Sequence, residues 1–179
     1  RASYSKRVQR PPAFLLNPFL IYVDPKTYQQ GNPDLQPQET QAFEASYEQR
    51  RGQTSYLATV YYRQNEDEFT QVAHDLGGGV FVITADNLGS SRSAGLELVA
   101  NGKLSQTLTY SANTTLFWTQ ISAANLGFAG DRSAFGLNGR LNLNWQATPD
   151  DLLQLNASAQ GKRLLAQGEI QPSWTLNFG

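Results

Sequence analysis

The stretch that decides the fold runs from residue 135 to residue 145 and reads Phe135-Gly136-Leu137-Asn138-Gly139-Arg140-Leu141-Asn142-Leu143-Asn144-Trp145. Its odd-numbered positions hold Phe, Leu, Gly or Trp, whereas its even-numbered positions hold Gly, Asn or Arg. Successive side chains of a β-strand point to opposite faces of a sheet. The stretch therefore predicts a strand with one apolar face and one polar face.

The same alternation recurs along most of the chain, where no segment keeps a helical period over ten residues. It predicts an all-β fold, an antiparallel up-and-down meander of about eight long strands. The expected strands are residues 1–8, 38–50, 54–65, 91–102, 108–118, 135–145, 153–160 and 174–178.

The connections alternate between short and long. Short turns are expected at 51–52, 103–106 and 149–150, and long Gly/Pro/Asn-rich connections at 9–37, 66–90, 121–133 and 162–172. In a meander, all short turns then lie at one rim, which is typical of bacterial outer-membrane barrels. Strands of about a dozen residues are also long enough to cross a bilayer at a tilt.

Aromatic residues lie near the ends of several expected strands. They are either ordinary strand formers or members of the aromatic girdles that flank the apolar band of a membrane barrel. The residues concerned are Tyr47, Tyr61, Tyr62, Trp118, Trp145 and Trp174.

Composition excludes several classes of function. The 14 Lys and Arg residues nearly balance the 15 Asp and Glu residues, which argues against a nucleic-acid partner. The chain has no Cys, so it forms no disulfide and no thiolate metal site. Its longest apolar stretch, 13–23, is too short for a membrane-spanning helix and predicts a packed loop or an interfacial segment.

Catalytic chemistry is poorly supported. His74 is the only histidine and lies beside Asp75, so a Ser-His-Asp hydrolase is a formal possibility, but no nucleophile motif surrounds it. The glycines 77–79 predict a hairpin tip between 69–72 and 80–84. We therefore expect no enzyme activity, no cofactor and no metal site.

A series of motifs in the first hundred residues resembles the barrel of TonB-dependent outer-membrane receptors. The most specific is Gly31-Asn32-Pro33-Asp34-Leu35-Gln36-Pro37-Gln38, which precedes a strand bearing Glu44. The others are Tyr4-Ser5-Lys6-Arg7-Val8-Gln9-Arg10-Pro11, Asn17-Pro18-Phe19, Asp24-Pro25, Phe43-Glu44-Ala45-Ser46-Tyr47, Val60-Tyr61-Tyr62-Arg63, Asn87-Leu88-Gly89 and Gly95-Leu96-Glu97-Leu98.

The resemblance implies a function for a larger parent protein. Residues 1–179 would be a partial barrel domain, without a plug domain, from a 22-stranded transmembrane barrel in the outer membrane of a Gram-negative bacterium. Such a receptor imports a scarce nutrient of the siderophore, cobalamin or oligosaccharide class with inner-membrane energy. Outer-membrane lipid and a small nutrient are the implied partners, and the TonB complex would contact parts of the parent protein outside this chain.

Aromatic and basic residues in the expected loops are the candidates for an external ligand vestibule; alternatively, they pack the loops together. They are Phe19, Tyr22, Tyr28, His74, Phe81, Phe128 and Arg132. Glu44 and Glu97 are expected on the polar face, either paired with Arg63, Arg92 or Arg140 or solvated without a fixed partner.

Eight strands can also close on themselves. A self-contained small outer-membrane barrel with a structural or adhesive role is therefore the main alternative. If the chain is instead an arc of a larger barrel, its two edge strands and its apolar face predict self-association of the isolated fragment.

Overall fold

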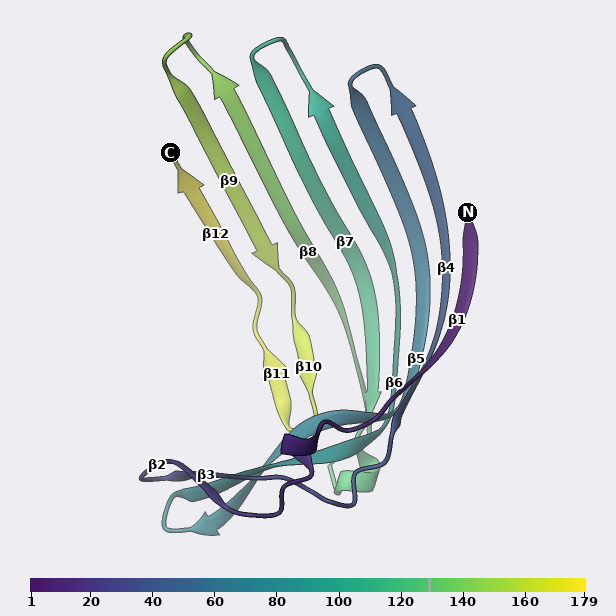
Figure 1. Ribbon diagram of the computed structural model, residues 1–179, viewed down its shortest axis with the longest axis vertical. Helices are drawn as coiled ribbons and strands as arrows, with labels where there is room; N and C mark the ends of the chain where they lie inside the picture. Colours follow the sequence, from purple (N-terminus) through teal and green to yellow (C-terminus); the bar gives the residue numbers. More distant parts are fainter. Residues whose placement is uncertain (129) are drawn as a thin grey trace.

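A computed structural model describes residues 1–128 and 130–179 and shows one large sheet with a smaller assembly across one end (Figure 1). The continuous path of the sheet is β1-β4-β5-β6-β7-β8-β9-β12, and every neighbouring pair on it is antiparallel. These strands are β1 (Ala2–Gln9), β4 (Gln38–Arg51), β5 (Thr54–Gly77), β6 (Val80–Lys103), β7 (Leu108–Ser122), β8 (Asp131–Gln146), β9 (Leu152–Gln160) and β12 (Ser173–Phe178).

The other elements lie in the longer connections. They are the 3-10 turns η1 (Ala13–Leu15) and η2 (Ala124–Leu126), and the short strands β2 (Ile21–Asp24), β3 (Thr27–Gln30), β10 (Arg163–Leu165) and β11 (Gly168–Ile170). Strands β10 and β11 form a separate hairpin. Of the residues that the structure describes, none belongs to a helix long and apolar enough to cross a membrane.

The predicted meander is confirmed, because each of the eight expected strands lies entirely or almost entirely inside an observed strand of the path. The three short turns join β4 to β5, β6 to β7 and β8 to β9 at the same rim (Figure 1). Strands β1 and β12 lie at opposite edges of the path, so the sheet is an open arc in the part of the chain described.

The prediction of a long loop at 66–90 is wrong. Strands β5 and β6 each contain 24 residues and stay paired from Ser55↔Asn101 as far as Gly77↔Val80. The predicted hairpin tip is confirmed, because Gly77, Gly78 and Gly79 have φ of 91°, 65° and 75°, a conformation that glycine adopts without strain. Residues 66–90 therefore keep their strand pairing outside the main sheet, and Val72, Val82, Ala85, Asn87 and Leu88 among them are buried.

This long hairpin bends where its pairing lapses. Glu66 pairs with Ser90 and Glu68 with Leu88, whereas Asp67, at φ 54°, has no partner in the ladder. Beyond the bend, the hairpin turns across the ends of the strands, and β3 pairs with β6 in parallel (Figure 1). We call β2, β3 and residues 67–90 the loop lobe.

The register gives the main sheet two different faces. Directly opposed residues share a face, so the apolar set of 135–145 continues from strand to strand as one outer face. The charged residues of that face, among them Arg92 and Asp131, lie outside the apolar set. It carries Ala94, Leu96, Leu98 and Ala100 of β6, Leu108, Tyr110, Ala112, Leu116 and Trp118 of β7, Phe135, Leu137, Leu141, Leu143 and Trp145 of β8, Leu153, Leu155, Ala157 and Ala159 of β9, and Trp174, Leu176 and Phe178 of β12.

A row of aromatic residues crosses the outer face near the loop lobe. Consecutive pairs in the register link Tyr4, Phe43, Tyr62, Ala94, Trp118 and Phe135, so five of these six positions are aromatic. Of the two alternatives for Tyr61, the girdle is excluded, because Tyr61 pairs with Glu44 and Gly95 on the opposite face. We call the six positions the aromatic row.

The outer face has the height of a membrane band. From Phe135 to Trp145, ten residue steps of about 3.3 Å at a tilt of about 45° rise about 23 Å, and the apolar band of outer-membrane barrels is about 25 Å tall. The ring of Phe135 is 80% exposed and that of Phe178 is 77% exposed. No second layer of the described chain covers this face, which fits a face solvated by lipid.

We predict opposite responses to charge on the two faces of β8. Leu141→Arg would place a guanidinium in the apolar band and should destabilise the barrel in a bilayer by about 2–4 kcal/mol. Asn142→Arg, one residue away on the polar face, is the matched control and should change stability little. Denaturant unfolding of the protein reconstituted in vesicles measures both, and equal effects would contradict the assignment of faces.

Candidate functional site

Two motifs far apart in sequence meet at the base of the loop lobe. The backbone N–H of Gln36 donates to Oδ1 of Asn87 at 2.8 Å, and Nδ2 of Asn87 donates to the carbonyl oxygens of Gln36 at 3.0 Å and Asp67 at 2.7 Å. Asn87 is 8% exposed. A single buried amide therefore holds the proline-rich entry to β4 against the bend of the long hairpin.

The start of the proline-rich motif is fixed by a close backbone approach. The N–H of Gly31 donates to the carbonyl of Asn17 at 2.7 Å, and the N–H of Asn32 donates to that of Leu15 at 2.6 Å. A Cβ at Gly31 would lie 2.5 Å from the Leu15 carbonyl oxygen. Only glycine fits here, because the backbone of residues 15–17 leaves no room for a side chain.

The loop lobe brings three of the candidate vestibule residues into one row. Tyr22 of β2 pairs with Tyr28 of β3, Tyr28 with Val82 of β6, and Val82 with His74 of β5. The rings of Tyr22 and Tyr28 are in edge contact, with centroids 6.0 Å apart and an interplanar angle of 78°. His74 lies in a strand and not in the loop expected from the sequence.

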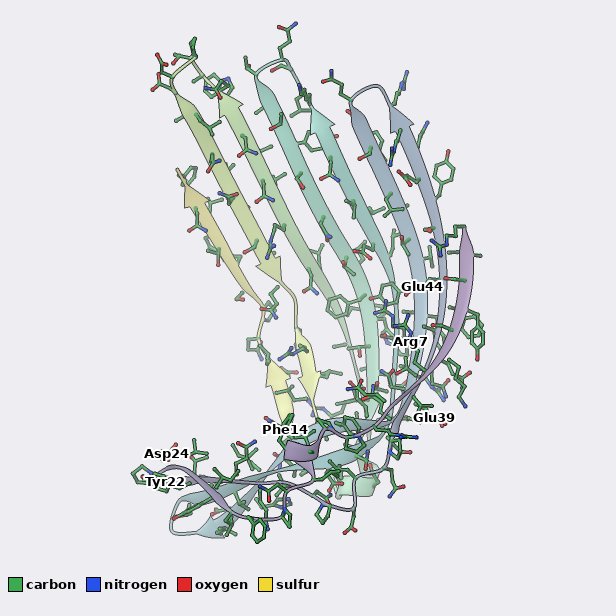
Figure 2. All side chains as sticks on the ribbon, in the orientation of Figure 1. Arg7, Phe14, Tyr22, Asp24, Glu39 and Glu44 are labelled. Carbon is green, nitrogen blue, oxygen red and sulfur yellow. The ribbon has the colours of Figure 1, made fainter. Side chains whose placement is uncertain are left out.

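Two further candidates lie nearby with their rings open to solvent. Phe81 pairs with Thr27 in the next row and is 41% exposed, and Phe19, in the segment before β2, is 76% exposed. Figure 2 shows Tyr22 and Asp24 at the far end of the lobe, well beyond the strands of the main sheet. The lobe thus presents aromatic surface outside the membrane band.

The last two candidates take part in contacts between loops. Arg132 donates to the carbonyl oxygens of Leu165 at 3.1 Å and Gly168 at 2.9 Å, which holds the β10–β11 hairpin beside β8. Phe128 packs against a small core of Leu88, Ile121, Ala123 and Ala166. Both contacts match the packing alternative, while a ligand role for any of the seven candidates stays a prediction.

The β10–β11 hairpin is also tied to the lobe and within itself. The amide of Gln167 accepts from Ala73 N at 2.7 Å and donates to Ala73 O at 2.8 Å. Lys162 lies 3.0 Å from Glu169, and its hydrogen bond, with a second from Gln171, lowers the pKa of the Glu169 carboxyl. The contacts of Gln167 therefore join the β10–β11 hairpin to the outer part of β5.

A cavity of about 390 Å³ lies between the lobe and this hairpin. It could not be predicted from the sequence, because its walls come from distant segments. Glu68, Thr70, Leu88, Ile121, Arg163 and Ala166 are among its lining residues. Glu68 accepts hydrogen bonds from Ser91 Oγ and, at 3.3 Å, from Asn65 Nδ2. The cavity combines an apolar floor with one carboxylate and one guanidinium.

The inner face of the sheet is mainly polar, and Leu57, Val99 and Phe117 are among its few apolar residues. Glu44 accepts from Arg63 at 2.8 Å, as one of the predicted pairings requires, and Figure 2 shows Glu44 along the main strands. Glu97 shares this face but forms no ion pair with any described residue. The suggestion that Arg92 could serve Glu44 or Glu97 is wrong, because Arg92 pairs with Gln64 and Gln120 on the outer face.

Amides and hydroxyls line a hollow of about 640 Å³ on the inner face. Its lining includes Asn113, Asn138, Arg140, Asn142, Ser158 and Thr175. Nearby, rings cover glycines: a Cβ at Gly95 would lie 2.7 Å from Tyr61 Oη, and one at Gly136 would lie 2.3 Å from Phe117 Cζ. Such aromatic–glycine pairs fix the register of a curved sheet.

Within the described chain, no three His, Cys, Asp or Glu side chains lie close enough together to hold a metal ion. The chain provides a mainly polar inner face, an apolar outer face and a loop lobe with exposed aromatic rings across one end of the sheet.

Comparison with known proteins agrees with this geometry. The model of the outer membrane protein beta-barrel family matches residues 1–179. The siderophore receptor PirA from Pseudomonas aeruginosa superimposes with a TM-score of 0.66 at 20% identity, over 90% of this chain and 31% of that one. The copper transporter OprC gives 0.66 at 13% identity, over 99% of this chain and 28% of that one.

A variant of the ferric enterobactin receptor PfeA from Pseudomonas aeruginosa gives a TM-score of 0.59 at 18% identity, over 99% of this chain and 29% of that one. The chain thus spans less than a third of the length of these solved proteins. A comparison with curated proteins finds no match. The predicted resemblance to the receptor barrel is confirmed at the level of the fold.

We predict that Asn87→Ala loosens the loop lobe. The substitution leaves the Gln36 backbone groups and the Asp67 carbonyl without their partner, which should cost about 1–3 kcal/mol of local stability. Hydrogen exchange of the Gln36 amide measures the loss. Asn101→Ala, which removes an exposed 2.6 Å hydrogen bond from Ser111, is the control, and unchanged protection at Gln36 in the Asn87 variant would refute this role.

Proposed function

The chain belongs to the outer membrane protein beta-barrel family, and from that premise we propose that it forms part of the barrel of a TonB-dependent receptor that imports a scarce nutrient. Residues 1–179 are then a partial domain of a 22-stranded barrel. The plug domain and the contact with the TonB complex belong to other parts of the parent protein.

The observation that carries the proposal is the two-faced sheet with the loop lobe across one end. A lipid-facing outer face alone would suit any outer-membrane barrel. A polar inner face with Glu44, Arg63, Glu97 and Arg140 suits a barrel wide enough to hold water or a plug. The open arc, with β1 and β12 unpaired with each other, favours this reading over a closed eight-stranded barrel with a structural or adhesive role.

The lobe supports ligand capture at the external mouth. Tyr22, Tyr28, Phe81, His74 and Phe19 offer exposed or half-exposed rings on one assembly. Aromatic faces stack on sugar rings and on aromatic chelators. We therefore propose a ligand of the siderophore, cobalamin or oligosaccharide class, and two of the similar structures are described as receptors for a siderophore or for ferric enterobactin.

Import by the complete receptor tests the proposal. Cells that express the complete receptor are offered a labelled ferric siderophore, labelled cobalamin and a labelled oligosaccharide, and we expect them to take up one of the three. This uptake should be lost when the inner-membrane energising complex is deleted. Uptake that persists unchanged after the deletion would contradict energy-dependent import.

The vestibule has its own test. Replacing both Tyr22 and Tyr28 with Ser should weaken capture of the imported ligand by the complete receptor, because the stacking surface of the lobe is lost. Tyr47→Ser, at the opposite rim of the sheet, is the control and should leave capture unchanged. Equal capture by all three proteins, measured as ligand bound to whole cells, would exclude the lobe as the binding surface.

We also propose that the isolated 179-residue chain self-associates. Its outer face is uncovered, and β1 and β12 each present one unpaired edge, both of which favour association. Light scattering of the chain purified without detergent should show oligomers. A monodisperse, soluble monomer would contradict this expectation.

A further inference from the structure

We propose that the cavity between the loop lobe and the β10–β11 hairpin binds a short zwitterionic peptide with an apolar side chain. The site is distinct from the proposed vestibule, because none of its lining residues belongs to the row of Tyr22, Tyr28 and His74. Its volume of about 390 Å³ lies within the usual range for small-molecule sites, which is about 300–1,000 Å³.

The floor of the cavity is apolar. Leu88 of β6, Ile121 of β7 and Ala166 of the hairpin line it, and all three are buried members of one cluster. Such a floor favours an aliphatic side chain, because contact with it removes apolar surface from water.

The lobe side of the cavity offers a free carboxylate oxygen. Glu68 pairs directly with Leu88 in the β5–β6 ladder, so its side chain lies on the face that carries the floor. Both of its hydrogen bonds, from Ser91 and Asn65, go to Oε2. No described residue donates to Oε1, and no buried side-chain N or O atom of the described chain lacks a partner, so Oε1 is open to solvent. It can accept a charge-assisted hydrogen bond from an ammonium group.

The hairpin side offers a free guanidinium. Arg163 of β10 lines the cavity and is exposed. In the part of the chain that the structure describes, it forms no ion pair, and no side-chain hydrogen bond engages it. Glu68 and Arg163 are therefore too far apart to neutralise each other. A ligand with charges of both signs can match both groups, whereas a ligand with one charge leaves the other group unmatched.

The charges around the cavity set the direction of the ligand. On the lobe side, Asp86 opposes Thr70 in the ladder and adds a second carboxylate beside Glu68. The hairpin side carries or contacts three basic residues and one acid, which are Arg132, Lys162, Arg163 and Glu169. The ammonium end of the ligand therefore belongs on the lobe side, and its carboxylate belongs on the hairpin side.

The free edge of β5 selects a peptide over a single amino acid. Gln38 accepts from Phe69 N at 3.4 Å, and Gln167 engages both N–H and C=O of Ala73. Backbone groups of alternate residues point to the same edge of an antiparallel strand, so those of Gln71 point to this edge too. No described residue bonds to them there, since β4 leaves β5 before this point.

Gln167 shows what this edge can accept. Its side-chain amide gives Ala73 one donor and one acceptor, as a peptide group of an added strand would. Gln71 lies two residues away and lines the cavity. The peptide group of a ligand can form the same pair of hydrogen bonds with Gln71.

Titration calorimetry of the complete receptor in detergent tests the site. The probe is the dipeptide alanyl-leucine, which should bind saturably. Glu68→Gln and Arg163→Gln should each weaken binding about tenfold, because each removes one charge-assisted hydrogen bond. A probe with an ester in place of its amide lacks the peptide N–H and should bind about fivefold more weakly.

Blocked probes assign each residue to one end of the ligand. N-acetyl-alanyl-leucine lacks the ammonium group, so it should bind the Glu68→Gln variant no more weakly than it binds the unchanged receptor. Alanyl-leucinamide lacks the carboxylate and should likewise be insensitive to Arg163→Gln. Losses as large as those seen with the free dipeptide would contradict the assigned ends.

Glu48→Gln and Arg50→Gln are the matched controls. They remove the two charges of an exposed ion pair on β4 at the opposite rim, so both should bind alanyl-leucine as the unchanged receptor does. Heat-modifiable migration checks the folding of every variant. No saturable binding, or equal affinity of the site and control variants, would overturn the proposal. The assay does not measure import, so its failure would leave the proposed import function standing.

Discussion

A backbone inside hydrocarbon has no water to satisfy its N–H and C=O groups, and this constraint explains most of the structure. Each of these groups must find a partner within the protein, and only a helix or a paired sheet provides enough partners. Within the main sheet, the unbroken ladder from β4 to β9 meets that need. Since the ladder satisfies the backbone, the outer side chains can be wholly apolar without a second protein layer.

The same ladder builds the functional end of the molecule. Strands β5 and β6 continue their pairing well past the membrane band, and the bend at Asp67 turns that pairing into a platform for β3. The Asn87 amide then ties the platform to the entry of β4. The loop lobe is therefore an extension of the main sheet and not a set of independent loops, which explains how it holds aromatic rings in a fixed row.

The alternation of apolar and polar residues was sufficient to predict the meander, its faces and its short turns, because a strand with one apolar and one polar environment alternates its residue types. The prediction failed where the sequence does not alternate. Residues 66–90 leave the membrane band and their faces are mixed, so the sequence predicted only the hairpin tip at 77–79 with its flanks and not the continuous pairing of β5 with β6. Tyr61 and Arg92 were misplaced because an aromatic or a cation near a strand end suits either face; only the register, set by distant strands, decides between them.

The central claim is that the two faces of the sheet meet different solvents. Spin labels placed singly at residues 141, 142, 143 and 144 of β8, in the complete protein reconstituted in vesicles, test it directly. The account predicts high accessibility to oxygen at 141 and 143 and high accessibility to a water-soluble nickel reagent at 142 and 144. Accessibility without a two-residue period, or with the opposite phase, would contradict it.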